Sequence, residues 1–197
     1  MSILTRVLDA GFGHPRGMAG RLGGVIMARA NAEQERWAVE RCRLRPGQDV
    51  LVLGYGPGLG VQYAADAVDP GGHVFGVDPS PAMHDMATAR CARHISRGTV
   101  VLTEQNAEQN GCAAASIDAV ISVNNVMHWD RAAGFAEISR VLRPGGVLVL
   151  TVHRHALPEG PEELRAEAEA AGLTDVTVEI RPRRHNGPAI HLVARAP

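Results

Sequence analysis

Residues 49–61 read DVLVLGYGPGLGV, an apolar run that breaks into alternating glycines and then continues as a helix-like segment. The apolar run predicts a buried β-strand, and the alternating glycines predict a tight turn from that strand into a helix. Because glycines carry no side chains, a ligand can lie directly against backbone N–H groups at the helix N-terminus. The segment therefore predicts a strand-turn-helix unit whose turn binds a ligand.

A second strand-like run, HVFGVDPS at 73–80, ends on an acidic residue, Asp78. A carboxylate that ends the strand beside a glycine turn can accept hydrogen bonds from both hydroxyls of a ribose. The two features together indicate a nucleotide-bearing cofactor. The nicotinamide fingerprint G-x-G-x-x-G, started at Gly54, requires glycine where this chain has Leu59, so the spacing disfavours a nicotinamide cofactor.

The chain resembles the class I S-adenosylmethionine-dependent methyltransferases, especially the small-molecule group that includes quinone-biosynthesis enzymes. The resemblance rests on the G-x-G-x-G turn, on Asp78 and on RVLRPGG at 140–146, in the family's order over residues 49–152. It implies that S-adenosylmethionine donates a methyl group to a nitrogen, oxygen or carbon nucleophile of a small molecule, leaving S-adenosylhomocysteine. It also implies an α/β, Rossmann-like, seven-stranded sheet with helices on both faces and the last strand antiparallel.

The alternation of strand-like and helix-like segments from residue 49 onward also predicts an α/β fold with a largely parallel sheet. We expect strands near 49–53, 73–77, 99–103, 117–123, 146–152, 174–180 and 189–195. We expect helices near 59–67, 81–95, 131–142 and 160–171. Only a short turn around 185–188 separates the last two strands, which requires them to pair antiparallel.

Residues 1–48 lie outside the resemblance, and we treat them as an N-terminal helical extension of a methyltransferase domain that spans residues 49–197. Within the extension, Asn31 and Gln34 resemble a capping pair that opens a helix. These boundaries leave one substantial domain and no second catalytic domain.

The glycine-punctuated residues 1–30 are the only polypeptide available to cover the site, and we expect them to act as a lid that excludes water. His14 and Arg16 lie in this segment and are expected to face the substrate. The alternative is a helix and loop packed permanently on the edge of the sheet.

The resemblance assigns cofactor contacts to the segments that follow the first four strands: Gly54, Tyr55, Gly56, Gly58, Asp78, Pro79, Met83, Asn106, Ala107 and Asn124. It implies that the glycines support the methionine and ribose portions, that Pro79 and Met83 flank the adenine, and that Asn106 accepts a hydrogen bond from its amino group. Ala107 would offer its backbone N–H to the ring, and Asn124 its backbone to the methionine amino group. Taken alone, Met83 is equally explained as a core residue, and both asparagines as turn residues.

Two positions depart from the family's pattern. The family commonly carries an acidic residue two positions before the first glycine, where this chain has Val52. How the ammonium group of the cofactor is bound is therefore left open. Tyr55, in place of the usual small residue, is expected to narrow the pocket.

The composition excludes several classes of function. The 197 residues include 45% hydrophobic side chains and carry a formal net charge of −1, which gives no electrostatic grip on nucleic acid or membrane. Three cysteines, far apart and without C-x-x-C spacing, are typical of reduced thiols. No segment resembles a membrane span or a signal peptide. We expect a cytoplasmic protein with a small-molecule substrate, and a homodimer is compatible with these features.

The nine histidines are unusually many for this length, and the predicted topology brings four of them to the carboxyl edge of the sheet. His128 is the first choice as catalytic residue because the family often has histidine there, and His153 is the second. We expect His155, His185 and Trp129 to contact the substrate. Since no carboxylate has a convincing ligand spacing from these histidines, we expect a base or orienting group and no metal.

Two alternatives remain open at this point. One is a methyltransferase fold that binds the cofactor without catalysis, as a partner subunit, which the missing acidic residue at position 52 leaves open. The other is a protein or peptide methyltransferase, for which an open groove without a cap would suit a larger substrate.

Overall fold

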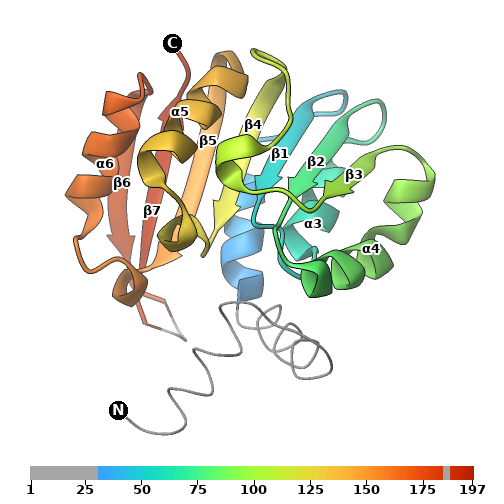
Figure 1. The fold of residues 1–197 in the computed structure, drawn as a ribbon, viewed down its shortest axis with the longest axis horizontal. Coiled ribbons are helices and arrows are strands. Elements are labelled where there is room, and N and C mark those ends of the chain that lie inside the picture. The colour runs from blue at the N-terminus through green and yellow to red at the C-terminus, as the bar shows by residue number, and fades with distance from the viewer. Residues whose placement is uncertain (1–30, 184–186) are drawn as a thin grey trace, which may run out of the picture.

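The computed structural model describes residues 31–183 and 187–197, which form a seven-stranded sheet in the order β3-β2-β1-β4-β5-β7-β6 (Figure 1). The strands are β1 (Asp49–Leu53), β2 (His73–Val77), β3 (Val100–Thr103), β4 (Ile117–Val123), β5 (Leu142–His153), β6 (Thr174–Arg181) and β7 (Ala189–Arg195). The pairings among β1 to β5 are parallel, whereas β7 runs antiparallel to both β5 and β6. The predicted Rossmann-like sheet with an antiparallel last strand is confirmed.

A leading helix, described over residues 31–42, precedes the sheet. The later helices are α3 (Leu59–Val68), α4 (Pro81–Ser96), α5 (Arg131–Val141) and α6 (Pro161–Ala170), with short 3-10 turns η1 (Ala107–Gln109), η2 (Val126–His128) and η3 (Arg154–Ala156). The four predicted helices agree with α3 to α6. Asn31 is already helical, so the expected capping pair of Asn31 and Gln34 is wrong. The expected lid over residues 1–30 lies outside the described residues.

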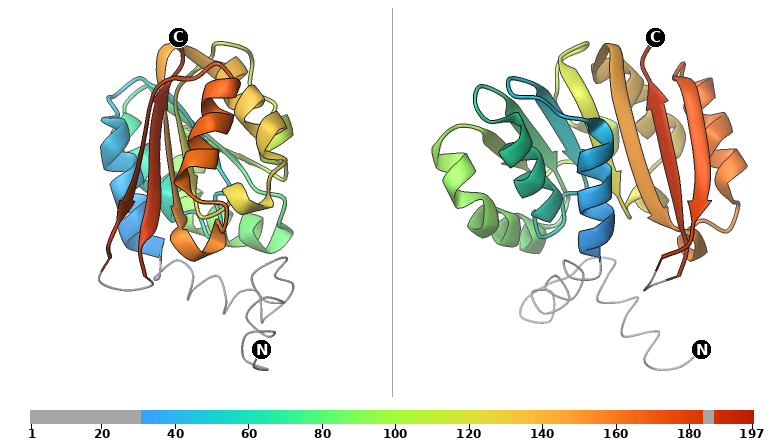
Figure 2. Two further views of the ribbon diagram at one scale, coloured as in Figure 1. Left: turned by 90° about the vertical axis from the view of Figure 1, so that its left-hand side faces the viewer. Right: turned by 180° about the vertical axis from the view of Figure 1, so that it is seen from behind.

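The helices cover the two faces of the sheet and enclose a separate apolar core on each face. The leading helix, α3 and α4 pack on one face, around side chains such as Ala38, Val61 and Ala87. On the other face α5 and α6 pack over the strands, around side chains such as Phe135 and Leu164. Figure 2 shows the leading helix and α3 in front of the sheet when the molecule is seen from behind. The described helices therefore lie on both faces, as the α/β pattern predicts.

The leading helix is tied to the carboxyl-terminal half of the sheet. Trp37 stacks on the buried ring of His191 in β7, with 3.7 Å between ring centroids. One turn earlier, the Gln34 side-chain amide donates to the hydroxyl of Thr151 in β5 at 2.9 Å. Burial lowers the pKa of His191 to about 4, so its ring is neutral near pH 7 and stacks as an uncharged aromatic. The described part of the N-terminal extension thus belongs to the packed domain.

The RVLRPGG stretch closes the amino edge of the sheet. The Arg143 guanidinium forms ion pairs with the carboxylates of Asp49, at 3.0 Å, and of Asp118. Asp49 is the first residue of β1, and Asp118 is the second residue of β4. The Asp118 carboxylate also accepts from the Asp49 backbone N–H at 2.8 Å. β5 begins at Leu142, four residues before its predicted start, and its register with β4 is irregular up to the Ala119–Val147 pair. The irregularity includes Pro144, which has no N–H to donate to a regular ladder.

The strand order reverses between β1 and β4, so the loops that follow these two strands lie at the same edge. In open parallel sheets, ligands bind in the crevice at such a switch point. The topology therefore directs attention to the glycine turn after β1 and to Asn124 and Asn125 after β4. The amino edge, held by Arg143, is at the opposite end of the same strands.

Gly58→Ala should destabilise the fold more than Gly98→Ala. Both glycines have a left-handed φ, +83° and +78°, which costs a residue with a Cβ about 1–2 kcal/mol. A Cβ at Gly58 would also lie 2.8 Å from the Cα of Ala87 in α4, whereas one at Gly98 would meet no atom within 4 Å. This overpacking should cost a further ~1–3 kcal/mol in the free energy of unfolding. Urea unfolding of both variants measures the difference, and equal losses would contradict the close approach of α3 and α4.

Candidate functional site

The glycine turn between β1 and α3 is crowded by a neighbouring side chain, which explains its composition. Gly54 has φ +63°, and a Cβ there would lie 1.7 Å from the side-chain nitrogen of Asn125. Asn125 is fixed by two hydrogen bonds: its amide donates to the Leu53 carbonyl, and its oxygen accepts from the Ser122 hydroxyl at 2.7 Å. Asn125 thus joins the ends of β1 and β4. Sequence reasoning missed it, although it stands next to Asn124 at the predicted end of a strand.

Asp78 links the end of β2 to the glycine turn. One carboxylate oxygen accepts from the Gly56 N–H at 2.8 Å, and the other accepts from the Ser80 N–H at 2.9 Å. The residue is 8% exposed, and burial raises the pKa of its carboxyl, while the two N–H donors and the nearby His128 oppose that rise. A carboxylate has about four acceptor positions, so two remain for ribose hydroxyls. The arrangement fits the adenosine part of S-adenosylmethionine.

The other predicted cofactor residues fall into two groups. Met83 is 3% exposed within the core, and Tyr55 is buried with its hydroxyl 3.0 Å from Nδ1 of His84. Burial raises the pKa of Tyr55, and its side chain packs in the core, so it does not narrow an open pocket as we expected. Pro79 and Asn106 are exposed at the carboxyl edge, whereas Ala107, which begins η1, is buried. Their contacts with the adenine stay predictions.

Asn124 is the centre of a hydrogen-bond network at the ends of β4 and β5. It adopts a left-handed φ of +54°, and its side-chain amide donates to the oxygens of Asn31, at 3.0 Å, and Gln34, at 2.9 Å. Its own oxygen accepts from the His153 backbone N–H at 2.9 Å. The Asn124 side chain therefore holds the leading helix against β5. Asn31 and Gln34, interpreted from sequence as a helix cap, have this role instead.

The tautomer of His153 follows from its contact with Arg183. A guanidinium nitrogen of Arg183 lies 2.6 Å from Nδ1 of His153, and arginine can only donate, so Nδ1 must be the acceptor. The proton of the neutral ring is then on Nε2. Burial, Arg183 and the stacked ring of His155 lower the pKa of His153 to about 4. Near pH 7 this histidine is a neutral hydrogen-bond donor, which does not suit the general base we expected.

Arg183 also binds the leading helix and the turn before β7. It donates to the side-chain oxygen of Gln34 and, at 3.0 Å, to the Gly187 carbonyl. The pattern of the sequence gave no reason to single out this arginine among many. It connects the end of β6 with the network around Asn124.

The remaining predicted site residues differ in their exposure and in the groups that they contact. His128 ends η2 and is exposed, and it lies close enough to Asp78 to affect the pKa of that carboxyl. His155 is exposed in η3 with its ring 5.2 Å from that of His153. Trp129 packs edge-on against Phe135, with 6.1 Å between centroids, and so serves packing first. His14, Arg16 and His185 lie outside the described residues.

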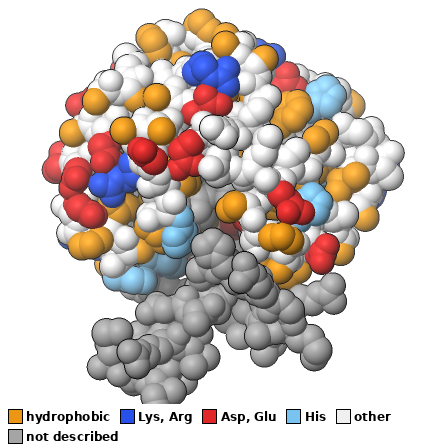
Figure 3. All heavy atoms as spheres, in the orientation of Figure 1, with side chains coloured by type: hydrophobic (Ala, Val, Ile, Leu, Met, Phe, Trp, Pro, Cys, Tyr) orange, Lys and Arg blue, Asp and Glu red, His pale blue; other side chains and the backbone are white. Residues whose placement is uncertain are grey.

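Three observations concern the surface and the possible metal or membrane sites of the described residues. On the face in Figure 3, arginine side chains lie among acidic ones and form no broad basic area, and histidine side chains lie at the lower left and on the right. No helix in the described residues is long and apolar enough to cross a membrane. In the same residues, no group of three or more His, Cys, Asp and Glu side chains is arranged to hold a metal ion.

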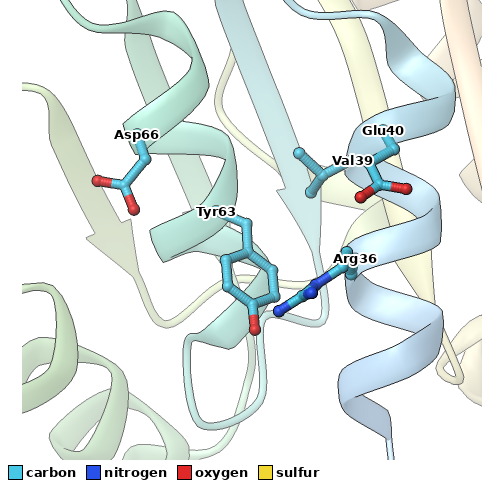
Figure 4. Close-up of a pocket in the computed structure, with 5 residues that line it drawn as sticks. All are labelled: Arg36, Val39, Glu40, Tyr63 and Asp66. Carbon is cyan, nitrogen blue, oxygen red and sulfur yellow. The ribbon is translucent and has the colours of Figure 1, made fainter.

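Two hollows lie away from the glycine turn. A cleft of about 280 Å³ between the leading helix and α3 is lined by Arg36, Val39, Glu40, Tyr63 and Asp66, with the Arg36 guanidinium 5.6 Å from the centre of the Tyr63 ring (Figure 4). A second hollow of about 460 Å³ lies over β1 to β3 and includes Phe75, Val101 and Cys112. Neither is lined by Gly54, Asp78 or Asn124, so neither is the cofactor site.

The tautomer of His153 can be tested directly. We expect long-range ¹H–¹⁵N NMR spectra at pH 7 to show its Nε2–H form and titration to give a pKa near 4, because protonation would place charge beside Arg183. Removing that neighbour in Arg183→Gln should raise the pKa of His153. An Nδ1–H tautomer in the unmodified protein would contradict this assignment.

Comparison with known proteins places the chain in a family. Residues 51–150 match the model of the methyltransferase domain. The chain is 30% identical over 168 residues to the methyltransferase YdaC of Bacillus subtilis, an alignment that covers 81% of this chain and 90% of that protein. It is 37% identical over 108 residues to nocamycin O-methyltransferase of Saccharothrix syringae, covering 54% of this chain and 38% of that enzyme.

Solved structures agree in fold. A phosphoethanolamine N-methyltransferase of Haemonchus contortus, in complex with phosphomonomethylethanolamine and S-adenosylhomocysteine, superposes with a TM-score of 0.76 at 18% identity. The superposition covers 100% of this chain and 61% of that one, so the chain spans less than two thirds of that enzyme. At this identity the likeness concerns the fold. Because the family model and the Bacillus relative match most of the sheet and its glycine turn, the chain belongs to the class I S-adenosylmethionine-dependent methyltransferases.

Proposed function

We propose that this methyltransferase acts on a nitrogen, oxygen or carbon nucleophile of a small molecule, at the carboxyl edge of β1 and β4. The observation that carries the proposal is the bond between Asp78 and the Gly56 N–H at 2.8 Å. This bond holds the Asp78 carboxylate beside the glycine turn, which has no side chains. A carboxylate in that place can accept hydrogen bonds from the ribose hydroxyls, and the bare turn leaves room for the part of the cofactor attached to the ribose. The other contacts in the site are built around this pair.

The protein's contribution to the reaction is mainly alignment. S-adenosylmethionine supplies a methyl group already activated on a sulfonium, so no side chain has to activate it. Holding the nucleophile in line in a dry site can supply about 7–11 kcal/mol of the barrier. The network of Asn124, Gln34 and Arg183 provides rigidity at the edge where the acceptor would lie. A base is needed only where the nucleophile must lose a proton.

His128 and His153 have different roles in this proposal. His128 is exposed beyond the glycine turn and has no hydrogen-bonded ring nitrogen in the described residues, so it can accept a proton from the nucleophile. His153, with its proton on Nε2, can donate a hydrogen bond that orients the acceptor. His155 stacks beside it and extends the polar surface toward solvent.

Of the alternatives, family membership supports an enzyme and not a non-catalytic partner subunit. Incubating the protein with methyl-labelled S-adenosylmethionine and a cell extract distinguishes a small-molecule methyltransferase from a protein methyltransferase. Label in the small-molecule fraction supports the proposal, and label in protein supports a protein methyltransferase. An absence of label in either fraction, with the cofactor bound, would favour the non-catalytic alternative.

Asp78→Ala should weaken binding of S-adenosylhomocysteine by about 100-fold or more. The substitution removes a charged acceptor for two hydroxyls, and each such bond contributes about 1.5–3 kcal/mol. Isothermal titration calorimetry measures the change. Glu104→Ala, which removes an exposed carboxylate after β3 at the same edge, should bind as the unmodified protein does. An Asp78→Ala variant of undiminished affinity would overturn the assignment of the ribose site.

His128→Ala should lower the rate of methyl transfer by roughly 100- to 10,000-fold if it is the general base. Its S-adenosylhomocysteine affinity should change far less. His73→Ala, at the amino edge of β2, is the matched control and should transfer at the unmodified rate. Should His128→Ala turn over normally with the cofactor bound, transfer proceeds by alignment alone and the assignment of the base fails.

A further inference from the structure

The leading helix carries a buried carboxyl group that the cofactor contacts described so far do not use. Glu35 is 9% exposed and forms no hydrogen bond or ion pair with the described residues. Burial alone raises the pKa of its carboxyl to about 8. A buried carboxyl group without a partner is costly to ionise. Its ionised form becomes favourable when a cation binds beside it.

Glu35 lies against the start of α3. Its Oε2 is 2.2 Å from the position that a Cβ on Gly60 would occupy, so the carboxyl group lies directly against the backbone of α3 at this glycine. Gly60 is the second residue of α3, directly after the glycine turn that ends at Gly58. The carboxyl group therefore lies beside the glycine turn that is proposed to support the cofactor.

The start of α3 and Glu35 together provide opposite charges. The first turn of a helix has N–H groups without intrahelical partners, and α3 has neither a side-chain cap nor an acidic residue in its first turn. A carboxylate ligand is favoured at those N–H groups, and an ammonium group is favoured at Glu35. An amino-acid zwitterion matches this pair, and the methionine portion of the cofactor is one.

Val52 leaves the end of β1 without a carboxyl group for the ammonium of the cofactor. It is 3% exposed in the core beneath the glycine turn, so the end of β1 offers no negative charge to an ammonium group. We propose that Glu35 of the leading helix binds the α-ammonium group of the cofactor's methionine portion. The inference rests on the cofactor assignment above and names the group that this chain uses in place of an acidic residue in β1.

The other charged or titratable side chains on the leading helix and on the elements packed against it include Glu33, Arg36, Glu40, Arg41, Cys42, Tyr63, Asp66, Arg183 and His191. Several already have partners: Arg36 lies over the Tyr63 ring, Asp66 pairs with His94 at 3.1 Å, and Arg183 bonds His153. His191 is neutral near pH 7, and Glu33 is exposed. Glu35 is thus the group that should ionise when the cofactor binds, and its proton passes to the solvent.

Calorimetry of the unmodified protein provides the first test, in two buffers of different ionisation enthalpy at pH 6.5. S-adenosylhomocysteine should release close to one proton, because Glu35 is protonated beforehand and ionised afterwards. 5′-Methylthioadenosine, which has the adenosine and sulfur but no amino-acid part, should release none. Equal proton release by the two ligands would overturn the inference, because Asp78 contacts only the part that both share.

Glu35→Gln provides the second test. Between pH 6 and pH 7 the affinity of the unmodified protein for S-adenosylhomocysteine should rise about tenfold, the limit for one released proton, whereas that of Glu35→Gln should stay constant. Binding of 5′-methylthioadenosine should be unaffected by the substitution. Glu40→Gln, an exposed residue of the same helix in the cleft of Figure 4, should behave as the unmodified protein does.

The outcomes separate this inference from the cofactor assignment. If both ligands bind and Glu35→Gln keeps the unmodified affinity and pH dependence for S-adenosylhomocysteine, Glu35 does not bind the ammonium group, although the methyltransferase assignment stands. If neither ligand binds the unmodified protein, the cofactor assignment itself fails. Loss of pH dependence in Glu35→Gln, with 5′-methylthioadenosine binding retained, supports the inference and also shows that the variant is folded.

Discussion

The close approach of three elements to the glycine turn after β1 is the constraint on which the site depends. Asn125 lies where a Cβ of Gly54 would be, Ala87 lies against Gly58, and the Glu35 carboxyl lies against Gly60. Each contact is made where the turn or the start of α3 has no side chain, and each comes from a different element: the end of β4, α4 and the leading helix. The same bare backbone that lets these elements meet also lets a cofactor lie against the turn.

Asp78 places a hydrogen-bond acceptor beside this closely packed turn. Its carboxylate would be costly to bury alone, and the N–H groups of Gly56 and Ser80 offset that cost. The bond to Gly56 also fixes the turn relative to β2, so the proposed acceptor for the ribose and the proposed surface for the rest of the cofactor are held together without a ligand. Such preorganisation reduces the entropy lost on binding.

The opposite side of the site, at the ends of β4 and β5, is built from neutral amides and one guanidinium. Asn124, Gln34 and Arg183 satisfy one another, and Arg183 fixes the tautomer of His153. A network of this kind is rigid because each member has its partners. It leaves His153 as a donor and makes the exposed His128 the candidate for proton transfer. The division of roles between these histidines follows from their hydrogen bonds and not from their positions in the chain.

The leading helix connects the two sides. Its Gln34 reaches the network, and the next residue, Glu35, reaches the start of α3, because neighbouring positions on a helix point about 100° apart. Although residues 1–48 lie outside the family resemblance, the described part of this extension therefore provides contacts to both halves of the edge. Because the carboxyl end of β1 has Val52 and no acidic residue, the proposed role of Glu35 would supply a carboxyl group from this helix.

The sequence by itself determined the order of strands and helices, the glycine turn, Asp78 and the family, because these depend on local patterns of apolar residues, glycines and one strand-ending acid. It also brought His128, His153 and His155 to the correct edge, since the carboxyl ends of parallel strands share an edge. Only the tertiary structure decided what each side chain does there. Gln34 bonds Thr151 across 117 residues, and Arg183 bonds His153 across 30, and no local pattern encodes such pairs. The tautomer of His153, the burial of Tyr55 and the burial of the Glu35 carboxyl without a partner among the described residues all arise from packing between elements distant in sequence. Local patterns do not contain this information, which is why a helix cap, a general base and a narrowed pocket were predicted.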